Sequence, residues 1–455
     1  MPRRTGSSPQ PLLLDLLARG PASSAALSQA LGVSQPTASR LLQALERGGR
    51  VVRFGNTRGA RYGLARVVGR IGSEWPLYRI DEAGTPEQIA SLHAIAPNGY
   101  IVSGGPSRVR GMFEGLPYYL EDARPAGFLG RAIPAAYPEL ALPPRVVDWS
   151  DAHVLAYLTQ RGSESVGNLI LGTEALNRYL RSAQSAPIVP AGNRAATYPQ
   201  LASQAMFGAP PGSSAHGEHP KFSARVDVDG ALVHVLVKFS PPVDTPVGLR
   251  WADLLISEHI ALATLSDAGV ATASSEICEF QGQVFLESRR FDRVPDDGRR
   301  GVASLLSVST AWHGEIDRWS AAARRLHADD LLSADDAERL VLLDTFGALI
   351  ANTDRHFGNV TLFDDYEGRF RLAPVYDMLP MLFAPQDGQL LEREFEPPPP
   401  SAESLAIWGT ACELAERYWA RLAAEPRLSA DFRRRSERAA ASIRRLGTRA
   451  RPLRE

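Results

Sequence analysis

The 455-residue sequence contains almost no lysine and very little cysteine. Only two lysines, Lys221 and Lys238, occur among its 50 basic residues, and both fall in one 18-residue window. A guanidinium does not replace a compact ammonium group over a phosphate, so both lysines are candidate phosphate contacts, with chance retention as the alternative. The two cysteines, Cys278 and Cys412, exclude a disulfide framework and a cysteine-only zinc site, and they suit a reducing cytoplasm.

A long apolar run and an overall charge are also lacking. The longest apolar runs, such as 232–237, are far shorter than the roughly 20 residues that cross a bilayer. No signal-type apolar core follows the basic start at 1–4. We therefore expect no membrane segment and a cytoplasmic location. The net charge of −1 at pH 7 indicates no partner for the chain as a whole.

The first 66 residues predict a winged helix-turn-helix. Pro36 falls in the first turn of the third expected helix, where it removes no hydrogen bond. The helices are expected at 11–19, 24–31 and 35–47, and the strands of a hairpin, whose tip is the wing, at 51–54 and 60–64.

Charge favours a nucleic-acid partner for this segment. Ten arginines against two acidic residues give residues 1–66 a net charge of +8, which suits double-stranded DNA. A helical dimerisation or protein-binding module is the alternative. The side chains expected to contact DNA can hydrogen-bond to base edges or phosphates: Gln35, Thr37, Ser39, Arg40, Gln43 and Arg58. The segment resembles winged-helix transcription factors of the MarR and GntR kind.

Residues 67–185 predict an α+β module without recognisable chemistry. We expect strands at 77–80 and 100–103, a helix at 86–94, and a loop at 161–169 that leads into a strand.

Residues 186–300 predict a nucleotide-binding lobe. Strands at 223–228 and 231–239 are joined by Asp229-Gly230, a strong hairpin signal. Lys238 ends the second strand, where kinases place a lysine that contacts phosphates. The glycine-bearing loop 210–222 can present backbone N–H groups to phosphates, although it is not a Walker A loop and a solvent-exposed linker is the alternative. Glu258, on a helix expected at 251–265, can pair with Lys238 or lie at the surface.

The polar stretch 352–359 predicts a phosphotransfer site. It follows a buried helix expected at 337–350 and precedes a hairpin of 360–363 and 370–373. Phosphoryl transfer needs a carboxylate that accepts a proton and oxygen ligands for magnesium, which Asp354, Asn359 and Asp377 supply. Asp354 and Asn359 are five residues apart, as in protein kinases. Helix capping is the alternative role for these side chains.

The remainder, 301–455, is expected to be mostly helical, with helices at 411–424 and 431–446. The run 396–400, Glu-Pro-Pro-Pro-Pro, predicts a stiff spacer.

The motifs together resemble the HipA family of bacterial serine/threonine kinases, in particular its helix-turn-helix-bearing, YjjJ-like branch. They lie at 213–221, Lys238, 290–293, 352–359 and 374–377. The resemblance implies an α+β, two-lobed protein-kinase-like fold with an N-terminal winged helix-turn-helix domain, and domains at 1–66, 67–185, 186–300 and 301–455. It also implies ATP and Mg²⁺ as cofactors and an unidentified protein substrate. Two departures are His216, which replaces a smaller residue, and the fused DNA-binding module, which family members with a separate antitoxin lack.

By the same resemblance, Asp354 is the catalytic base, and Asn359 and Asp377 bind magnesium. Ser214 or Ser213 is the autophosphorylated residue. The residues implied to contact ATP are His216, Gly217, Glu218, His219, Pro220, Lys221, Lys238, Arg289, Arg290, Phe291, His356, Phe357, Gly358, Asn359, Tyr376 and Asp377. A kinase acting on a small molecule or lipid and a nucleotide-sensing transcription regulator without kinase activity are the alternatives. The sequence identifies neither the operator nor the oligomeric state.

Overall fold

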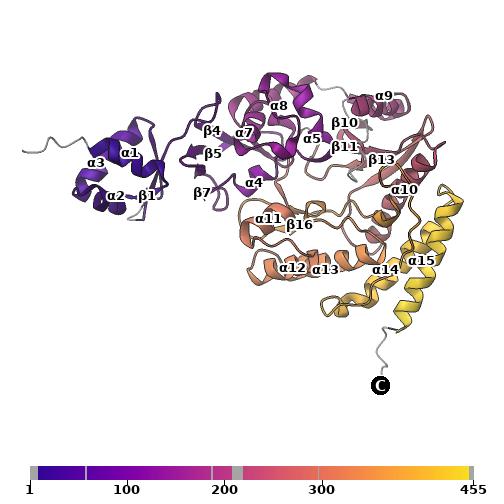
Figure 1. Ribbon diagram of the computed structural model, residues 1–455. Coiled ribbons are helices and arrows are strands. Elements are labelled where there is room, and N and C mark those ends of the chain that lie inside the picture. Colours follow the sequence, from indigo (N-terminus) through magenta and orange to yellow (C-terminus); the bar gives the residue numbers. More distant parts are fainter. Residues whose placement is uncertain (1–8, 57–58, 186–187, 208–218, 296, 450–455) are drawn as a thin grey trace, which may run out of the picture. The chain divides into compact units, whose positions relative to one another are not determined.

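The computed structural model describes residues 9–56, 59–185, 188–207, 219–295 and 297–449. The chain divides into two compact units, which Figure 1 lets the reader follow by colour along the sequence. The first unit comprises 1–81, 85–124 and 148–184, and the second comprises 82–84, 125–147 and 185–455.

The start of the first unit is a winged helix-turn-helix, as predicted. Its elements are α1 (Pro9–Ala18), β1 (Ala22–Ser23), α2 (Ser24–Leu31), α3 (Gln35–Arg47), β2 (Val51–Phe54) and β3 (Arg61–Leu64). Ser23 and Ser34 cap α2 and α3 by accepting a backbone N–H in the first turn, and Gly32 ends α2 in the left-handed conformation. Leucines from all three helices, with Val51 and Tyr62 of the hairpin, form the core. The short β1, which pairs with β3, was not expected.

The rest of the first unit is built on a five-stranded antiparallel sheet of order β7-β6-β5-β4-β8. The strands are β4 (Glu74–Ile80), β5 (Pro86–Ile95), β6 (Gly99–Gly104), β7 (Gly111–Phe113) and β8 (Leu169–Leu171), and the helices are α4 (Tyr118–Glu121), α7 (Asp151–Arg161) and α8 (Thr173–Ser185). The predicted helix at 86–94 was wrong, because this segment is β5, paired with both β4 and β6. Ala90, Leu92 and Ala94 alternate as buried residues, the period of two that a strand requires.

The second unit contains a five-stranded sheet of order β12-β13-β11-β10-β9. Its strands are β9 (Ile188–Pro190), β10 (Lys221–Val228), β11 (Ala231–Phe239), β12 (Ser275–Phe280) and β13 (Gln283–Arg289). The β10–β11 hairpin turns at Asp229-Gly230, as predicted, and Asp229 and Gly230 both have positive φ. Helix α9 (Arg194–Phe207) packs on one side, where Tyr198 joins Phe222, Phe239 and Phe285 in an apolar core. Helix α10 (Pro246–Ser266) contacts β11, β12 and β13.

The remaining part of the second unit is mostly helical, as predicted for residues 301–455. Its helices are α5 (Gly127–Arg131), α6 (Ile133–Ala136), α11 (Leu305–Trp312), α12 (Trp319–Ala328), α13 (Ala334–Leu349), α14 (Trp408–Ala424) and α15 (Ala430–Arg449). Helices α12 to α15 pack each against the next (Figure 1), and α13 buries the predicted apolar face of Leu340, Leu343, Phe346 and Leu349. A small sheet of β14 (Val302–Ser304), β15 (Thr361–Phe363) and β16 (Arg371–Leu372) contacts α13 through β16 and includes the predicted hairpin.

Within the described part of the chain, the helices are all too short or too polar to cross a membrane. Cys278 and Cys412 are free and buried.

Candidate nucleotide-binding and catalytic site

Lys238 forms the centre of a buried charge cluster in the second unit. It is the penultimate residue of β11, its Nζ donates to both carboxylate oxygens of Glu258 on α10 at 2.8 and 2.7 Å, and it also contacts the carboxylate of Asp377. Glu258 Oε1 accepts the backbone N–H of Asp377 at 3.1 Å. The pairing of Glu258 with Lys238, which the sequence left open, is therefore present. The ammonium group links the five-stranded sheet to the segment that follows the small hairpin.

Electrostatics fix the charge state of this cluster. Burial alone disfavours the ammonium ion, but the charges of Asp377 and Glu258 outweigh it and raise the pKa of Lys238. For Asp377, burial is outweighed by the charges of Lys238 and Lys221, so the pKa is lowered. Burial dominates for Glu258 and raises its pKa despite Lys238. Lys238 and Asp377 are thus held in their charged forms.

Asn352 joins the two aspartates that the sequence placed at the site. Its side chain is fully buried; its Nδ2 donates to the carbonyl of Asp377 at 3.2 Å, and its Oδ1 accepts the N–H of Asp354 at 2.9 Å. Asn359 Nδ2 donates to the carbonyl of Asp354 at 2.8 Å. Ala351, with φ of 60°, turns the chain out of α13 into this loop. Asp354, Asn359 and Asp377 are therefore brought together by short polar contacts.

Asp354 has the environment of a proton acceptor. Burial raises the pKa of its carboxyl group and the charge of Asp377 adds to this, with His356 acting in the opposite direction. A raised pKa makes a carboxylate a better base, provided it is still ionised at the working pH. The His356 ring lies close, with Nε2 at 4.0 Å from Asp354 Oδ1, and its Nδ1 accepts the N–H of Gly358 at 3.1 Å.

Arg355 supports the loop 352–359, here named the catalytic loop after its proposed role, from the α13 side; this contact was not predicted from the sequence. Its Nε donates to Asp344 Oδ1 at 3.1 Å, and its guanidinium also donates to the carbonyl of Asn352. The other Asp344 oxygen accepts the N–H of Ser320 at 3.1 Å. A Cβ on Gly347 would lie 2.6 Å from Arg355 Cδ, so glycine leaves room for this side chain. The spacing of Asp344 and Arg355 carries no motif, and only Asn352, as the first polar residue after a buried helix, could have been singled out.

The two lysines lie on neighbouring strands. Lys221 and Lys238 are directly paired across β10 and β11, so their side chains leave the same face of the sheet. The ring of His219 packs against Trp251 of α10, with the two ring centroids 4.6 Å apart. Burial and the charges of Lys238 and Lys221 lower the pKa of His219 to about 3, so the imidazole is neutral. Because the His219 ring is neutral, the positive charge on this face of the sheet comes from Lys221 and Lys238.

Aromatic rings continue the site toward the end of β13. Phe291 lies 5.9 Å, centroid to centroid, from both Phe363 and Tyr376. The Tyr376 hydroxyl hydrogen-bonds to the Thr361 hydroxyl at 2.8 Å and donates to the carbonyl of Gly358 at 3.1 Å. Phe291, Gly358 and Tyr376, all predicted ATP contacts, therefore form one connected group.

Other predicted ATP contacts have different surroundings. Arg289 is exposed, and the guanidinium of Arg290 donates to Asp292 at 3.0 and 2.7 Å. The backbone N–H of Arg290 donates to the carbonyl of His234 at 2.9 Å, so this segment is linked to β11 through its backbone. Phe357 is buried in the core below the loop, and Pro220 is buried beside β10. The predicted residues that lie outside the described part are His216, Gly217, Glu218, Ser213 and Ser214.

The donor set fits a nucleotide together with magnesium better than a metal alone. Nowhere in the described ranges do three His, Cys, Asp or Glu side chains gather closely enough to hold a metal ion. Magnesium in nucleotide sites takes one or two carboxylates and completes its shell with phosphates and water. The carboxylate of Asp377 and the amide oxygen of Asn359 could supply such protein ligands, and the two lysines carry the charge that could pair with phosphates.

In the first unit, three of the predicted DNA contacts lie on the exposed side of α3: Gln35, Arg40 and Gln43. Thr37 and Ser39 are half-buried and hydrogen-bond within the module, Thr37 to the Ser34 hydroxyl at 2.9 Å and Ser39 to the Ser24 hydroxyl at 3.2 Å. Leu41, expected inside, is half-buried. Arg58 lies outside the described residues.

Comparison with known families now decides the relationship. The model for the HipA-like C-terminal domain matches residues 213–451, that for the middle domain of YjjJ-like toxins matches 71–180, and that for the MarR family matches 5–61. The chain is 38% identical over 424 residues to the protein named Toxin YjjJ of Escherichia coli (strain K12), covering 92% of this chain and 94% of that one. This chain belongs to the HipA family.

A solved HipA structure agrees with this fold. A chain of the Shewanella oneidensis MR-1 toxin–antitoxin complex of HipA, HipB and operator DNA covers 82% of this chain with a TM-score of 0.50 and 15% identity, and is itself covered to 97%. The Helicobacter pylori proinflammatory kinase CtkA covers 50% of this chain, and 94% of CtkA is covered, with a TM-score of 0.35 and 12% identity. The predicted α+β fold with an N-terminal helix-turn-helix is confirmed by the HipA likeness and the family matches.

Proposed function

We propose that this HipA-family chain is an ATP- and magnesium-dependent serine/threonine protein kinase that acts in the cytoplasm and binds double-stranded DNA through residues 1–66. Four domains are proposed, at 1–66, 67–185, 186–300 and 301–455. The proposal rests above all on one arrangement: Lys238 lies between Glu258 and Asp377, while Asn352 hydrogen-bonds to both Asp377 and Asp354.

The chain's own residues would divide the work of phosphoryl transfer. Asp354 would orient the acceptor hydroxyl and take its proton on a carboxylate oxygen. Lys221 and Lys238 would hold the phosphates, and Asp377 and Asn359 would hold magnesium. ATP, when bound, supplies the phosphoryl group and magnesium neutralises charge on it. Glu258 would hold the side chain of Lys238 at the site. Asn352 would fix the positions of Asp354 and Asp377 relative to each other, because it hydrogen-bonds to the backbone of both.

Transfer from γ-labelled ATP to proteins of a bacterial extract tests this proposal. Asp354→Asn removes the proton acceptor with little change in shape, and a general base contributes about 10²- to 10⁴-fold. We expect transfer to fall within that range while the affinity for an ATP analogue, measured by calorimetry, changes less than about threefold. A wild-type chain that binds no nucleotide would contradict the proposal.

The same assay separates the alternatives. Label that appears on a small molecule or lipid and on no protein would identify a kinase with a different acceptor. Nucleotide binding without any transfer would identify a sensor that controls transcription. Neither alternative has an observation of its own in the described residues.

Regulation by autophosphorylation and by DNA completes the proposal. Ser214 or Ser213 is the proposed self-modified residue, and mass spectrometry of the chain after incubation with ATP would show which. The Escherichia coli relative is named a toxin, and a toxin activity is proposed for this chain too, with the fused helix-turn-helix acting on the chain's own operator. A Ser213→Ala and Ser214→Ala double variant should then lose self-labelling without losing DNA binding.

A further inference from the structure

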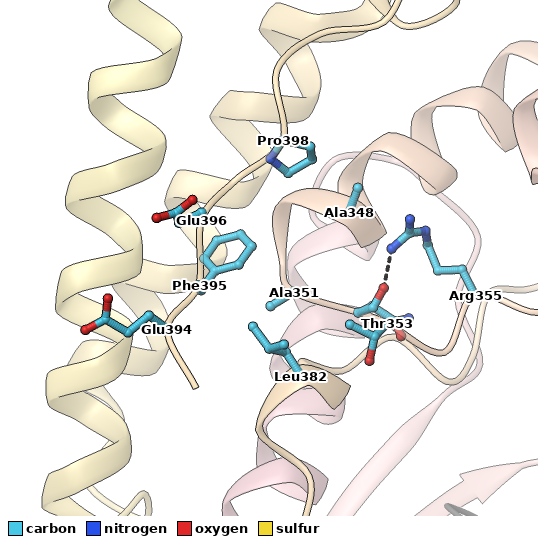
Figure 2. A pocket seen from close by; sticks show the side chains of 10 residues that line it. Ala348, Ala351, Thr353, Arg355, Leu382, Glu394, Phe395, Glu396 and Pro398 are labelled. Carbon is cyan, nitrogen blue, oxygen red and sulfur yellow. Dashed lines mark hydrogen bonds between the residues drawn. The ribbon is translucent and has the colours of Figure 1, made fainter. Parts of the chain in front are cut away.

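A pocket of about 380 Å³ lies in the second unit on the side of the catalytic loop where Thr353 and Arg355 point (Figure 2). Asp354, which lies between these two residues, does not line it. The pocket is therefore beside the proposed phosphotransfer site and distinct from it. Its walls combine apolar side chains, two glutamates and part of the loop: Ala348, Ala351, Asn352, Thr353, Arg355, Leu382, Glu394, Phe395, Glu396 and Pro398.

One wall of the pocket is an extended segment with an open backbone. Across the described residues, no backbone hydrogen bond involves 394–398, and this segment belongs to no helix or strand. Prolines at 397 and 398 fix φ at these two positions and stiffen the end of the segment. Unpaired backbone groups along an extended segment can accept an added peptide strand.

Side chains along this wall alternate between two faces. In Figure 2, Phe395 points toward the pocket side, whereas the carboxylates of Glu394 and Glu396 extend the other way. The ring of Phe395 lies 5.6 Å from that of Trp419, which fixes it. Both glutamates are exposed, and neither is in an ion pair within the described part of the chain. Glu392 differs from them, because Arg435 pairs with it at 2.8 Å.

Cross-strand neighbours in added strands lie on the same face. A peptide that pairs with 394–396 and directs one side chain into the pocket would therefore place the two flanking side chains beside Glu394 and Glu396. An apolar side chain matches the pocket floor of Ala348, Ala351 and Leu382, and basic side chains match the two carboxylates.

We propose that this pocket docks an extended segment of the protein substrate, in which an apolar residue is flanked on both sides by lysine or arginine. This inference rests on the proposed kinase function, because it takes the docked protein to be the substrate. Docking here, beside Asp354, would raise the effective concentration of the acceptor hydroxyl at the catalytic loop without occupying it. The main-chain pairing supplies affinity, and the flanking charges supply selectivity.

A phage-displayed library of random 12-residue peptides, selected on the full-length chain, tests the docking site without requiring catalysis. Enriched peptides should carry the basic–apolar–basic pattern and bind in fluorescence anisotropy. Ala348→Phe, which fills the pocket, should weaken their binding at least tenfold. Ala334→Phe, an exposed alanine on the same helix, is the matched control and should leave binding unchanged.

Charge reversal gives a second, independent measurement. Because Glu394 and Glu396 are exposed, the Glu394→Lys and Glu396→Lys double variant does not disturb the core, and selection on it should enrich acidic residues in place of basic ones. Enriched peptides that bind wild type and Ala348→Phe equally, or a selection unchanged by charge reversal, would overturn the proposal. Peptide binding in a chain that transfers no phosphate to any protein would instead overturn the kinase function and leave the binding site standing.

Discussion

The two functional regions of this chain use positive charge in opposite ways. In the N-terminal module, the described arginines at 19, 40, 47, 50, 53, 61 and 66 form no ion pair within the part of the chain that the structure describes. At the proposed catalytic site, Lys238 is buried and contacts two carboxylates. An unpaired positive charge at the surface attracts a polyanion over a long range, and salt weakens this attraction. A buried charge that is paired with carboxylates acts only on the groups it contacts.

This difference predicts that substitutions in the two regions have effects of different size and kind. Loss of one surface arginine removes one of several similar contacts, so its effect should be small and dependent on salt. Loss of one member of a buried charge group leaves the others unpaired, so its effect should be large and affect folding as well as activity. Four measurements, from the largest expected effect to the smallest, test this comparison.

Lys238→Met should give the largest effect. It leaves the Glu258 and Asp377 carboxylates close together without their shared cation, and breaking a buried pair costs about 3–5 kcal/mol. We expect a loss of this size in the free energy of unfolding, measured by urea denaturation, together with loss of phosphotransfer. Arg417→Met, at an exposed position, is the control and should change neither. A Lys238→Met chain of normal stability would refute the compensated-charge reading.

His219 should make stability depend on pH. Its folded pKa is about 3, against an ordinary value of 6.5. As the pH falls below 6.5, the unfolded chain takes up a proton that the folded chain refuses, so stability is lost progressively toward pH 3. His219→Gln should flatten this part of the profile. The difference in Tm between wild type and variant, followed from pH 7 to pH 4.5, measures it; parallel profiles would count against a neutral His219.

Asp354→Asn should stabilise the chain modestly at neutral pH. The folded pKa of Asp354 is raised, mainly by burial, so the folded state binds its proton more tightly than the unfolded state does. Ionisation therefore costs stability as the pH rises through the folded pKa, and the amide removes this cost. The gain in Tm should be present at pH 7.5 and vanish below the ordinary pKa of about 3.9. A gain that persists in acid would have another cause.

Arg40→Ala should give the smallest effect. Arg40 is exposed on α3, and loss of one phosphate contact should weaken binding to promoter DNA a few-fold and reduce the slope of log K against log salt by about 1. Fluorescence anisotropy at several salt concentrations measures both. Arg438→Ala, on the arginine-rich face of α15, should change neither; equal losses from the two variants would extend the DNA contact to that helix.

Patterns over short stretches were predicted well. The helices of the N-terminal module, the hairpin at Asp229-Gly230 and the buried helix before Asn352 follow from capping, turn and periodicity signals within about 15 residues. The segment 86–94 was misassigned because its composition does not exclude a helix, and only pairing with β4 and β6 makes it a strand.

Long-range polar contacts were not predictable in the same way. The sequence named Lys238, Asp354, Asn359 and Asp377 separately, but the hydrogen bond from Asn352 to the carbonyl of Asp377 depends on the return of the chain 25 residues later. Arg355 is held by Asp344, which lies on α13, 11 residues earlier in the chain. The sequence also left open whether Glu258 faces solvent or Lys238. Such pairings cannot be predicted from the periodicity of a short stretch of sequence.

The amino-acid sequence by itself determined which chemical groups are present and how far apart they lie along the chain: two lysines, the Asp354–Asn359 spacing and the charge of the first 66 residues. Tertiary structure alone decided which of these groups share a site, that Lys238 is compensated by Glu258, and that a pocket opens beside the catalytic loop. The reason is physical: burial and short-range hydrogen bonds arise between segments distant in sequence, and only packing sets those distances.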